Sequence, residues 1–305
     1  MPLSKQVYKW GYGDYIGPNK WGLYYPYCNG LRQSPINIIY KTVQHNQRLQ
    51  PLKLSNFDRI IHGNCTIRNN GKSIDIFIPQ TGNVPTLQDY RGEIYQSAGF
   101  HFHWGSTNSQ GSETWLNNRQ YPLEAHVVFW NTRFGDLQTA LYESDGLAVI
   151  GTLIDASIGK HNPSFDLVIE SIQKVKYNGQ KQNIKNFSLR SFVAESLSEY
   201  FLFNGSLTTP PCTENVLWHV MAGKISISPD QLNAFRNVYT TNSSVGVNSV
   251  KLLENFRPLQ KLNNRAVYSS FDISKLTGAS AGLYRSWLFI FLSTVLMFLT
   301  IDVML

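Results

Sequence analysis

Charged residues are scarce in this chain, and they do not gather into runs of one sign. Of 305 residues, 27 are Lys or Arg and 20 are Asp or Glu, which gives a formal net charge of +7. Proteins that bind nucleic acids carry basic runs or a patterned basic stripe, and this chain has neither. The sequence therefore predicts no nucleic-acid partner, although its mild positive charge suits an anionic ligand or an anionic cell surface.

The chain also lacks internal repeats and an interior linker. Short alternating stretches such as residues 73–78 are separated by Asn, Gly and Pro, which is typical of strands and turns. Residues 147–154 form an apolar run that predicts a buried central strand. Helical spacing occurs over residues 163–175 and 229–236, with Ser228 in the N-cap position of the second segment. We expect one mostly β domain of class α+β over residues 1–272.

No apolar secretion signal begins the chain, whereas the C-terminus ends in a hydrophobic run. Residues 287–305 are almost wholly apolar, and no Lys or Arg follows them to anchor a membrane-spanning helix. Small residues in the linker at 273–286 precede this tail, a pattern typical of a GPI-attachment signal, which we favour over a retained membrane helix. Because such a tail requires secretion, we expect the native precursor to begin further upstream; a tail-anchored cytosolic protein is the alternative.

Cysteine is scarce as well. An odd count of three leaves at least one thiol unpaired within the chain. Four Asn-x-Ser/Thr sequons are together suggestive of a glycoprotein. They begin at Asn64, Asn186, Asn204 and Asn242.

Three of the chain's seven histidines fall in two aromatic segments, at residues 99–104 and 123–130. Aromatic and β-branched neighbours predict that both segments are strands. Because side chains alternate along a strand, His101 and His103 project from one face. If His126 returns on an antiparallel neighbour, three imidazoles occupy three corners of a tetrahedron and leave the fourth open, as a catalytic zinc site requires.

A His-x-His pair alone is a weak sign of a metal, because most strand histidines are satisfied by a hydrogen bond. Cupin sites begin in the same way but need a Glu shortly afterwards, and residues 104–112 contain none. Amidohydrolase sites need repeated strand–helix units, which this chain lacks. A third fragment far downstream, Gly-Ser-Leu-Thr-Thr-Pro-Pro at 205–211, strengthens the interpretation as a metal site.

Taken together, several fragments resemble the α-class carbonic anhydrases in order and spacing over about residues 10–271. They are Trp-Gly-Tyr-Gly at 10–13, Arg-Gln-Ser-Pro-Ile-Asn-Ile at 32–38, His-Phe-His-Trp-Gly-Ser at 101–106, Gln-Gly-Ser-Glu at 110–113, Leu-Glu-Ala-His-Val-Val-Phe-Trp-Asn at 123–131 and the fragment at 205–211. The resemblance implies a large twisted, mostly antiparallel sheet with short peripheral helices and Zn²⁺ in a conical cleft. It also implies reversible hydration of carbon dioxide to bicarbonate and a proton.

The resemblance assigns roles to individual residues. Zinc lowers the pKa of a bound water from about 15.7 to about 7, a value that was established for carbonic anhydrase itself. Glu124 would orient a ligand histidine, and Thr208 would donate its hydroxyl proton to an ionised Glu113. Thr209 would place bicarbonate. The implied zinc ligands are His101, His103 and His126, and the implied apolar wall for the substrate is Val128, Val149, Leu207 and Trp218.

Three positions depart from the family pattern. Gly99 stands where a Gln would orient the first histidine. Lys72 replaces the proton-shuttling His, and because an unperturbed Lys has a pKa of about 10.4, it accepts a proton at pH 7 only if burial or nearby cations lower that value. Tyr12 and Asn70 match residues that order a water chain, whereas Asp75 replaces a neutral polar residue. We therefore expect slow proton release in weak buffer.

The same resemblance pairs Cys28 with Cys212, as in extracellular members, and leaves Cys65 over. It places the chain at the extracellular face of the plasma membrane, held by a GPI anchor or by its C-terminal tail. The sequence leaves homo-oligomerisation open. The alternative function is a catalytically silent surface-binding domain on the same scaffold, which the intact histidines, Thr208 and Glu113 disfavour.

Overall fold

The computed structural model describes residues 9–13, 15–61, 65–157, 159–242, 249–274 and 276. The chain divides into two units, Met1–Ser270 and Phe271–Leu305. The expected linker at 273–286 and hydrophobic tail at 287–305 lie almost wholly outside the described residues. Within the described ranges, no helix is both long enough and apolar enough to cross a bilayer.

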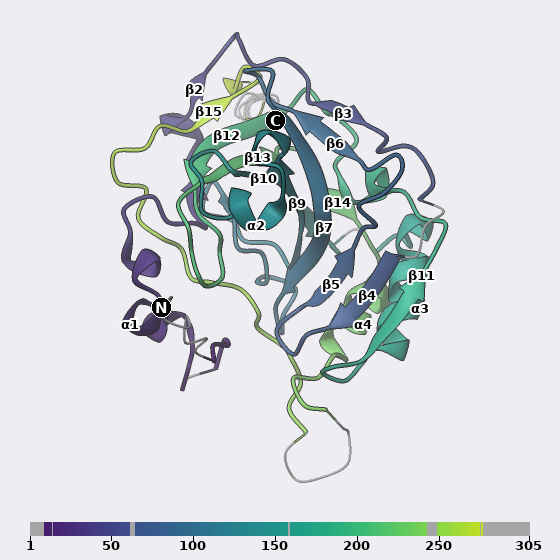
Figure 1. Ribbon diagram of the computed structural model, residues 1–305. Coiled ribbons are helices and arrows are strands. Elements are labelled where there is room, and N and C mark those ends of the chain that lie inside the picture. The colour runs from purple at the N-terminus through teal and green to yellow at the C-terminus, as the bar shows by residue number, and fades with distance from the viewer. Residues whose placement is uncertain are drawn as a thin grey trace, which may run out of the picture. The chain divides into compact units, whose positions relative to one another are not determined.

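A large twisted sheet organises the first unit (Figure 1). Within the described residues it has 13 strands. The order of its main path is β11 (Lys181–Ile184), β4 (Cys65–Asn69), β5 (Ile74–Phe77), β7 (Ile94–Trp104), β9 (Leu123–Asn131), β10 (Leu147–Asp155), β13 (Val216–Met221), β12 (Tyr200–Gly205), β15 (Tyr268–Ser269) and β2 (Gln44–His45). Beside this path, β14 (Ile225–Ser226) pairs with β10, β6 (Thr86–Gln88) with β7, and β3 (Lys53–Ser55) with β6. A separate ribbon joins β1 (Asn37–Ile38) to β8 (Trp115–Leu116).

Most neighbouring strands run antiparallel, so the predicted mostly β fold is confirmed. The sheet is nonetheless mixed, because β10 runs parallel to β13 and to β14. Strand β10 matches the predicted buried central strand at 147–154: every residue but the last is buried. A strand covered on both faces needs no polar alternation, which explains its continuous apolar run.

Short helices lie around the sheet (Figure 1). The α-helices are α1 (Trp21–Tyr24), α2 (Leu137–Ala140), α3 (Asp166–Lys174) and α4 (Pro229–Arg236). The 3₁₀ turns are η1 (Pro18–Lys20), η2 (Pro26–Asn29), η3 (Tyr40–Thr42), η4 (Thr132–Phe134), η5 (Pro163–Phe165) and η6 (Leu189–Phe192). Both predicted helices are confirmed, and Ser228 caps α4 by accepting a hydrogen bond from the backbone N–H of Gln231 at 3.2 Å.

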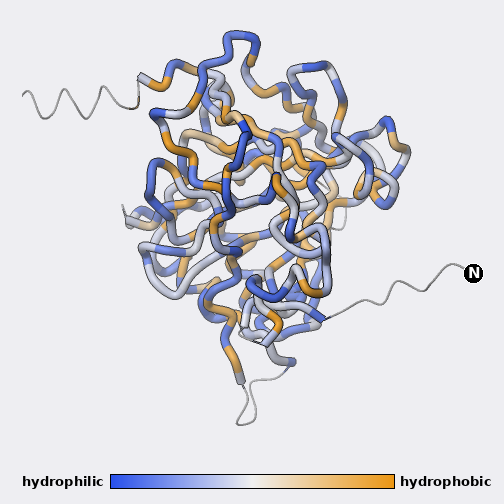
Figure 2. Tube along the Cα trace, turned by 90° about the vertical axis from the view of Figure 1, so that its left-hand side faces the viewer, coloured by the Kyte–Doolittle hydropathy of each residue, from blue (hydrophilic) through white to orange (hydrophobic). Residues whose placement is uncertain are grey.

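The hydrophobic core lies on one side of β7. Phe100, Phe102 and Trp104, which alternate along this strand, are all buried in it. Figure 2 shows that hydrophobic segments lie mostly inside the fold and hydrophilic segments mostly along the outer loops. The intervening residues of β7 therefore face the opposite side of the sheet, where the candidate site lies.

Candidate metal centre

Three histidines converge on one face of the sheet. Strands β7 and β9 are antiparallel neighbours, and His101 lies directly opposite His126 in their register. His103 stands two residues along β7, on the same face. One ring nitrogen from each of the three lies within 4.8 Å of the others. The side chains predicted to share a metal are thus adjacent.

The ring of His103 is oriented by a backbone carbonyl. Its Nδ1 lies 2.7 Å from the carbonyl oxygen of Asn255, and because a carbonyl oxygen can only accept, Nδ1 carries the ring proton. Nε2 is then an unprotonated acceptor, buried and without a hydrogen-bond partner among the described residues. A buried lone pair in this position fits a metal ligand.

The ring of His126 is oriented by a carboxylate on its own strand. Glu124 Oε1 accepts from His126 Nε2 at 2.9 Å, which leaves Nδ1 free to face the other histidines. Glu124 Oε2 accepts the backbone N–H groups of Glu113 and Thr114, at 2.7 and 2.8 Å. The carboxylate is therefore fixed at both oxygens, and it fixes the imidazole in turn.

Burial keeps all three imidazoles neutral at pH 7. It lowers the pKa of His101 to about 4 and the pKa of His126 to about 3. The pKa of His103 lies well below its ordinary value, again because of burial and then because of its two histidine neighbours. Neutral imidazoles offer their lone pairs, and three of them with an open fourth position are the donor set of a catalytic zinc.

His101 lacks the partner that orients the other two rings. None of its ring nitrogens makes a hydrogen bond to a described residue. Gly99, two residues earlier on the same face, has a φ of 153° beside a register shift in the β7–β9 pairing, and a Cβ there would collide with the carbonyl oxygen of Ile76. This position admits only glycine without a backbone shift.

Glu113 lies beneath the histidines in a buried network. Its Oε1 accepts the backbone N–H of Arg257 at 2.8 Å, and its carboxylate oxygens lie 3.5 Å from His103 Nδ1 and 4.0 Å from His126 Nδ1. Burial raises the pKa of the Glu113 carboxyl, while the Thr208 hydroxyl and the Arg257 N–H oppose that rise. Glu113 Oε2 has no hydrogen bond of ordinary geometry within the described part of the chain, so its contact with Thr208 is loose.

Two residues that support this site carry no signal in the sequence. Asn255 accepts the backbone N–H of Trp104 at 2.7 Å and donates to the carbonyl of Lys72 at 3.0 Å. The buried Arg257 guanidinium donates to Gln33 Oε1 at 2.8 Å and to the carbonyl of Cys28 at 3.2 Å. Both lie more than a hundred residues from their partners, and no local periodicity identifies them.

The predicted disulfide is confirmed. Cys28 and Cys212 are bonded across 184 residues, with their Cα atoms 4.9 Å apart. The backbone N–H of Cys212 donates to the carbonyl of Thr209 at 2.9 Å, so the bridge fixes the Thr208–Thr209 turn to the N-terminal region. Cys65 is buried with a free thiol, and burial raises its pKa to about 11, which makes it unreactive.

An apolar surface stands beside the histidines. Val128, Val149 and Trp218 are paired in register across β9, β10 and β13, and therefore form one row. The Trp218 ring lies 4.9 Å from that of His126, and its indole N–H donates to the carbonyl of Ser206 at 3.0 Å. The half-buried Leu207 comes directly after Ser206 in the chain.

Lys72 and Tyr12 lie at the rim of a hollow of about 770 Å³. The Lys72 ammonium sits 4.6 Å above the ring of Trp10. Burial lowers the pKa of Lys72, and Arg68 adds to that effect, whereas Asp75 opposes it. The pKa of Tyr12 is raised by burial and by nearby carboxylates.

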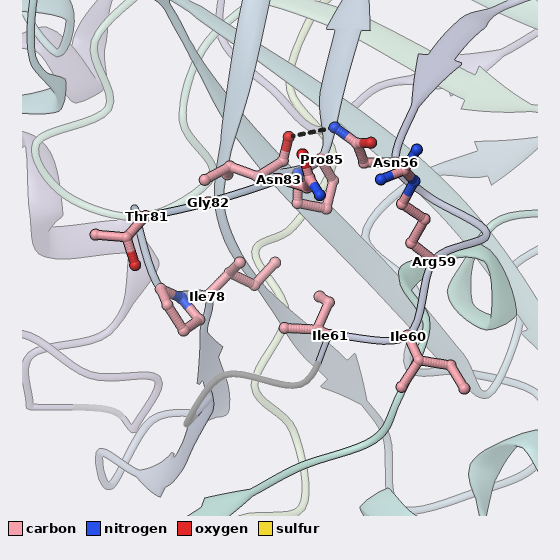
Figure 3. Close-up of a pocket in the computed structure, with 11 residues that line it drawn as sticks. Asn56, Arg59, Ile60, Ile61, Ile78, Thr81, Gly82, Asn83 and Pro85 are labelled. Atoms are coloured by element: carbon pink, nitrogen blue, oxygen red, sulfur yellow. Dashed lines mark hydrogen bonds between the residues drawn. The ribbon is translucent and has the colours of Figure 1, made fainter.

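A second hollow, of about 590 Å³, lies elsewhere on the unit (Figure 3). Ile60, Ile61 and Ile78 line it, and Asn56, also in its lining, donates to the carbonyl of Val84 at 3.3 Å. Arg59 is the charged side chain among its described lining residues. This hollow offers no set of metal ligands, so the histidine cluster is the candidate site.

The chain is similar to proteins of known activity. A family model described as eukaryotic-type carbonic anhydrase matches residues 16–271. Carbonic anhydrase 12 of Homo sapiens is 34% identical over 283 residues, which cover 91% of this chain and 78% of that protein. Carbonic anhydrase 1 of Mus musculus is 36% identical over 267 residues, which cover 86% of this chain and 98% of that protein.

Proposed function

Because this chain belongs to the eukaryotic-type carbonic anhydrase family, it catalyses the zinc-dependent hydration of carbon dioxide, and we propose how its own residues divide that task. The observation that carries the proposal is the convergence of three neutral imidazoles, with His103 and His126 buried and His101 half-buried, whose ligand nitrogens lie within 4.8 Å of one another. We assign His101, His103 and His126 as the zinc ligands. When bound, zinc supplies the Lewis acid that generates a nucleophile from water at neutral pH.

The neighbouring residues prepare both reactants. Val128, Val149, Leu207 and Trp218 form an apolar wall that accepts uncharged carbon dioxide and excludes bulk water. Glu113 accepts the backbone N–H of Arg257 at 2.8 Å. We assign Glu113 also as the acceptor for the Thr208 hydroxyl, which would turn a lone pair of the Thr208 oxygen toward the histidines. Thr208 thereby orients the attacking oxygen, and Thr209 positions bicarbonate.

We assign proton export to the residues around Lys72 at the rim of the hollow. Lys72, Tyr12 and Asn70 line the hollow of about 770 Å³, which we assign as the path of the proton to solvent. Asn70 Oδ1 accepts the backbone N–H groups of Lys72 and Ser73, both at 2.8 Å, which holds the lysine at the rim. Burial lowers the pKa of Lys72, but an ordinary lysine titrates so far above neutrality that we infer a protonated Lys72 that accepts protons poorly near pH 7, so this step is the slow one.

We propose that the chain works at the exterior face of the plasma membrane. The disulfide is typical of oxidising compartments. The apolar residues 287–305 after a small-residue segment are typical of a GPI-anchored precursor, and the sequon residue Asn186 is exposed. A retained membrane helix is the alternative form of attachment.

One experiment tests both the chemistry and the location. Cells expressing the full chain behind a cleavable secretion signal are treated with a phospholipase that cleaves GPI anchors, and zinc content and carbon dioxide hydration are measured in the released fraction. We expect one zinc per chain and full activity, with both lost in His126→Ala. His161→Ala is the matched control, because this exposed histidine pairs with Asp166 instead. Zinc-free parent protein would refute the catalytic proposal, and activity retained on the membrane would refute the GPI anchor.

A further inference from the structure

The three histidines of the site are not equally supported. Nδ1 of His103 donates to the Asn255 carbonyl, and Nε2 of His126 donates to Glu124, at 2.7 and 2.9 Å. His101 has no such acceptor among the described residues. A ligand ring that is not held by its second nitrogen can rotate, which weakens metal binding.

The strand that carries His101 cannot supply the missing acceptor. The preceding position on the same face is Gly99, where a side chain would collide with the carbonyl oxygen of Ile76. An acceptor for the His101 ring must therefore come from another element.

The neighbouring strand β5 offers an acceptor for the His101 ring. In the antiparallel pairing of β5 with β7, Asp75 lies directly opposite His101. Side chains opposite each other in such a pair share a face, with Cβ atoms about 4.5–5.5 Å apart. A carboxylate at that separation reaches an imidazole N–H directly or through one water.

The carboxylate of Asp75 is already fixed on one side. Its Oδ2 accepts from Arg68 Nη2 at 3.0 Å and from Asn70 Nδ2 at 2.6 Å. Its Oδ1 makes no hydrogen bond to any residue in the described ranges.

We propose that Asp75 is the positioning residue for His101, and that its carboxylate replaces, from β5, the side chain that Gly99 cannot provide. Arg68 and Asn70 hold Oδ2, which leaves Oδ1 available for the ring N–H of His101. The site then holds His126 and His101 with one carboxylate each, and His103 with a carbonyl. This inference rests on the zinc site proposed above.

The test compares two aspartates that have similar ion pairs. Asp75 pairs with Arg68 at 3.0 Å, and Asp145 pairs with Arg91 at 2.9 Å, but Asp145 has no place in the metal centre. The dissociation constant for zinc is measured on the purified full chain by competition with a chromophoric chelator. We expect Asp75→Ala to weaken zinc binding roughly 10–100-fold, and Asp145→Ala to leave it unchanged.

Two further measurements separate positioning from folding. In ¹⁵N-histidine spectra of the zinc-loaded parent, the His101 ring N–H gives a signal protected from solvent exchange, and this signal is lost in Asp75→Ala. The melting temperature of the zinc-free form is compared for each variant. Asp75→Asn, which preserves side-chain shape and one acceptor oxygen, should bind zinc with intermediate affinity.

Each outcome either supports or overturns the role of Asp75. Unchanged zinc affinity in Asp75→Ala overturns the proposal. So does a loss of affinity in Asp75→Ala and Asp75→Asn that merely follows a lower melting temperature of the zinc-free chain. A parent chain that binds no zinc overturns the proposed function itself, which is a distinct result.

Discussion

The floor of the site and its rim are built in different ways. The floor consists of His103, His126, Glu124 and Glu113, all buried and joined by hydrogen bonds or close contacts. The rim around Lys72 comes from the N-terminal segment and from the turn between β4 and β5, and it is partly open to solvent.

This difference separates two tasks of one enzyme. At the floor, each ring proton has a defined acceptor, so the lone pairs point toward the metal. At the rim, burial lowers the pKa of the Lys72 ammonium, whereas the face of Trp10 and the charge of Asp75 favour its charged form. The floor therefore matches the family pattern, and the departures at Lys72 and Asp75 affect proton export and ligand support.

The largest expected effect comes from breaking the long-range support of the floor. Replacing both Cys28 and Cys212 with Ala removes a bridge across 184 residues. The chain-entropy model gives a loss of up to roughly 5 kcal/mol in the free energy of unfolding, which denaturant titration measures. Carbon dioxide hydration should also fall, since Arg257 donates both to the Cys28 carbonyl and to Glu113.

Cys65→Ala is the control for this pair, because it removes a buried thiol without touching the disulfide. It should unfold at nearly the parental denaturant concentration. A double variant as stable as the parent would show that the loops hold the floor without the bridge.

A smaller effect is expected from acid, at the histidine that stands beside the floor. The pKa of His101 is about 4 in the folded chain and about 6.5 when unfolded. Between these values the unfolded state binds more protons, so the zinc-free chain is fully stabilised above pH 6.5 and loses stability as the pH falls toward 4. His101 alone accounts for roughly 3 kcal/mol at most.

Urea titrations of zinc-free protein at several pH values measure how the free energy of unfolding depends on pH. His101→Gln should make the free energy of unfolding depend less on pH, because one of the three clustered rings no longer titrates. A parental free energy of unfolding that stays constant between pH 6.5 and pH 4 would contradict the assignment of buried neutral histidines.

The sequence was sufficient for the parts of the floor that depend on local alternation. Period-two spacing placed His101 and His103 on one face of β7, and it placed Glu124 on the same face of β9 as His126. The role of Asn255 could not be predicted from the sequence, because its contact with His103 joins two residues that are 152 positions apart.

Gly99 shows a different limit. Alternation alone marks it as a position that faces the site, but the register shift and the nearby Ile76 carbonyl that exclude a side chain are visible only in the folded sheet. The partner across the sheet, Asp75, likewise depends on strand register. Pairing between strands is set by the whole sheet, and no single segment encodes it.

The smallest expected effect concerns the rim, where the sequence already marked Lys72 as a departure. An imidazole titrates near pH 6.5, so Lys72→His supplies a group that can both accept and release a proton at neutral pH. We expect turnover in weak buffer to rise by about tenfold, below the roughly 100-fold that a well-placed acid–base group contributes, because water still carries part of the flux. In concentrated buffer the variant and the parent should have the same turnover.

Lys251→His is the matched control, since Lys251 lines the same hollow but donates to Asn237 at 2.9 Å. If stopped-flow hydration in weak buffer is the same for Lys72→His and the parent, proton export through this position does not limit the rate, and the contrast between floor and rim has no kinetic consequence.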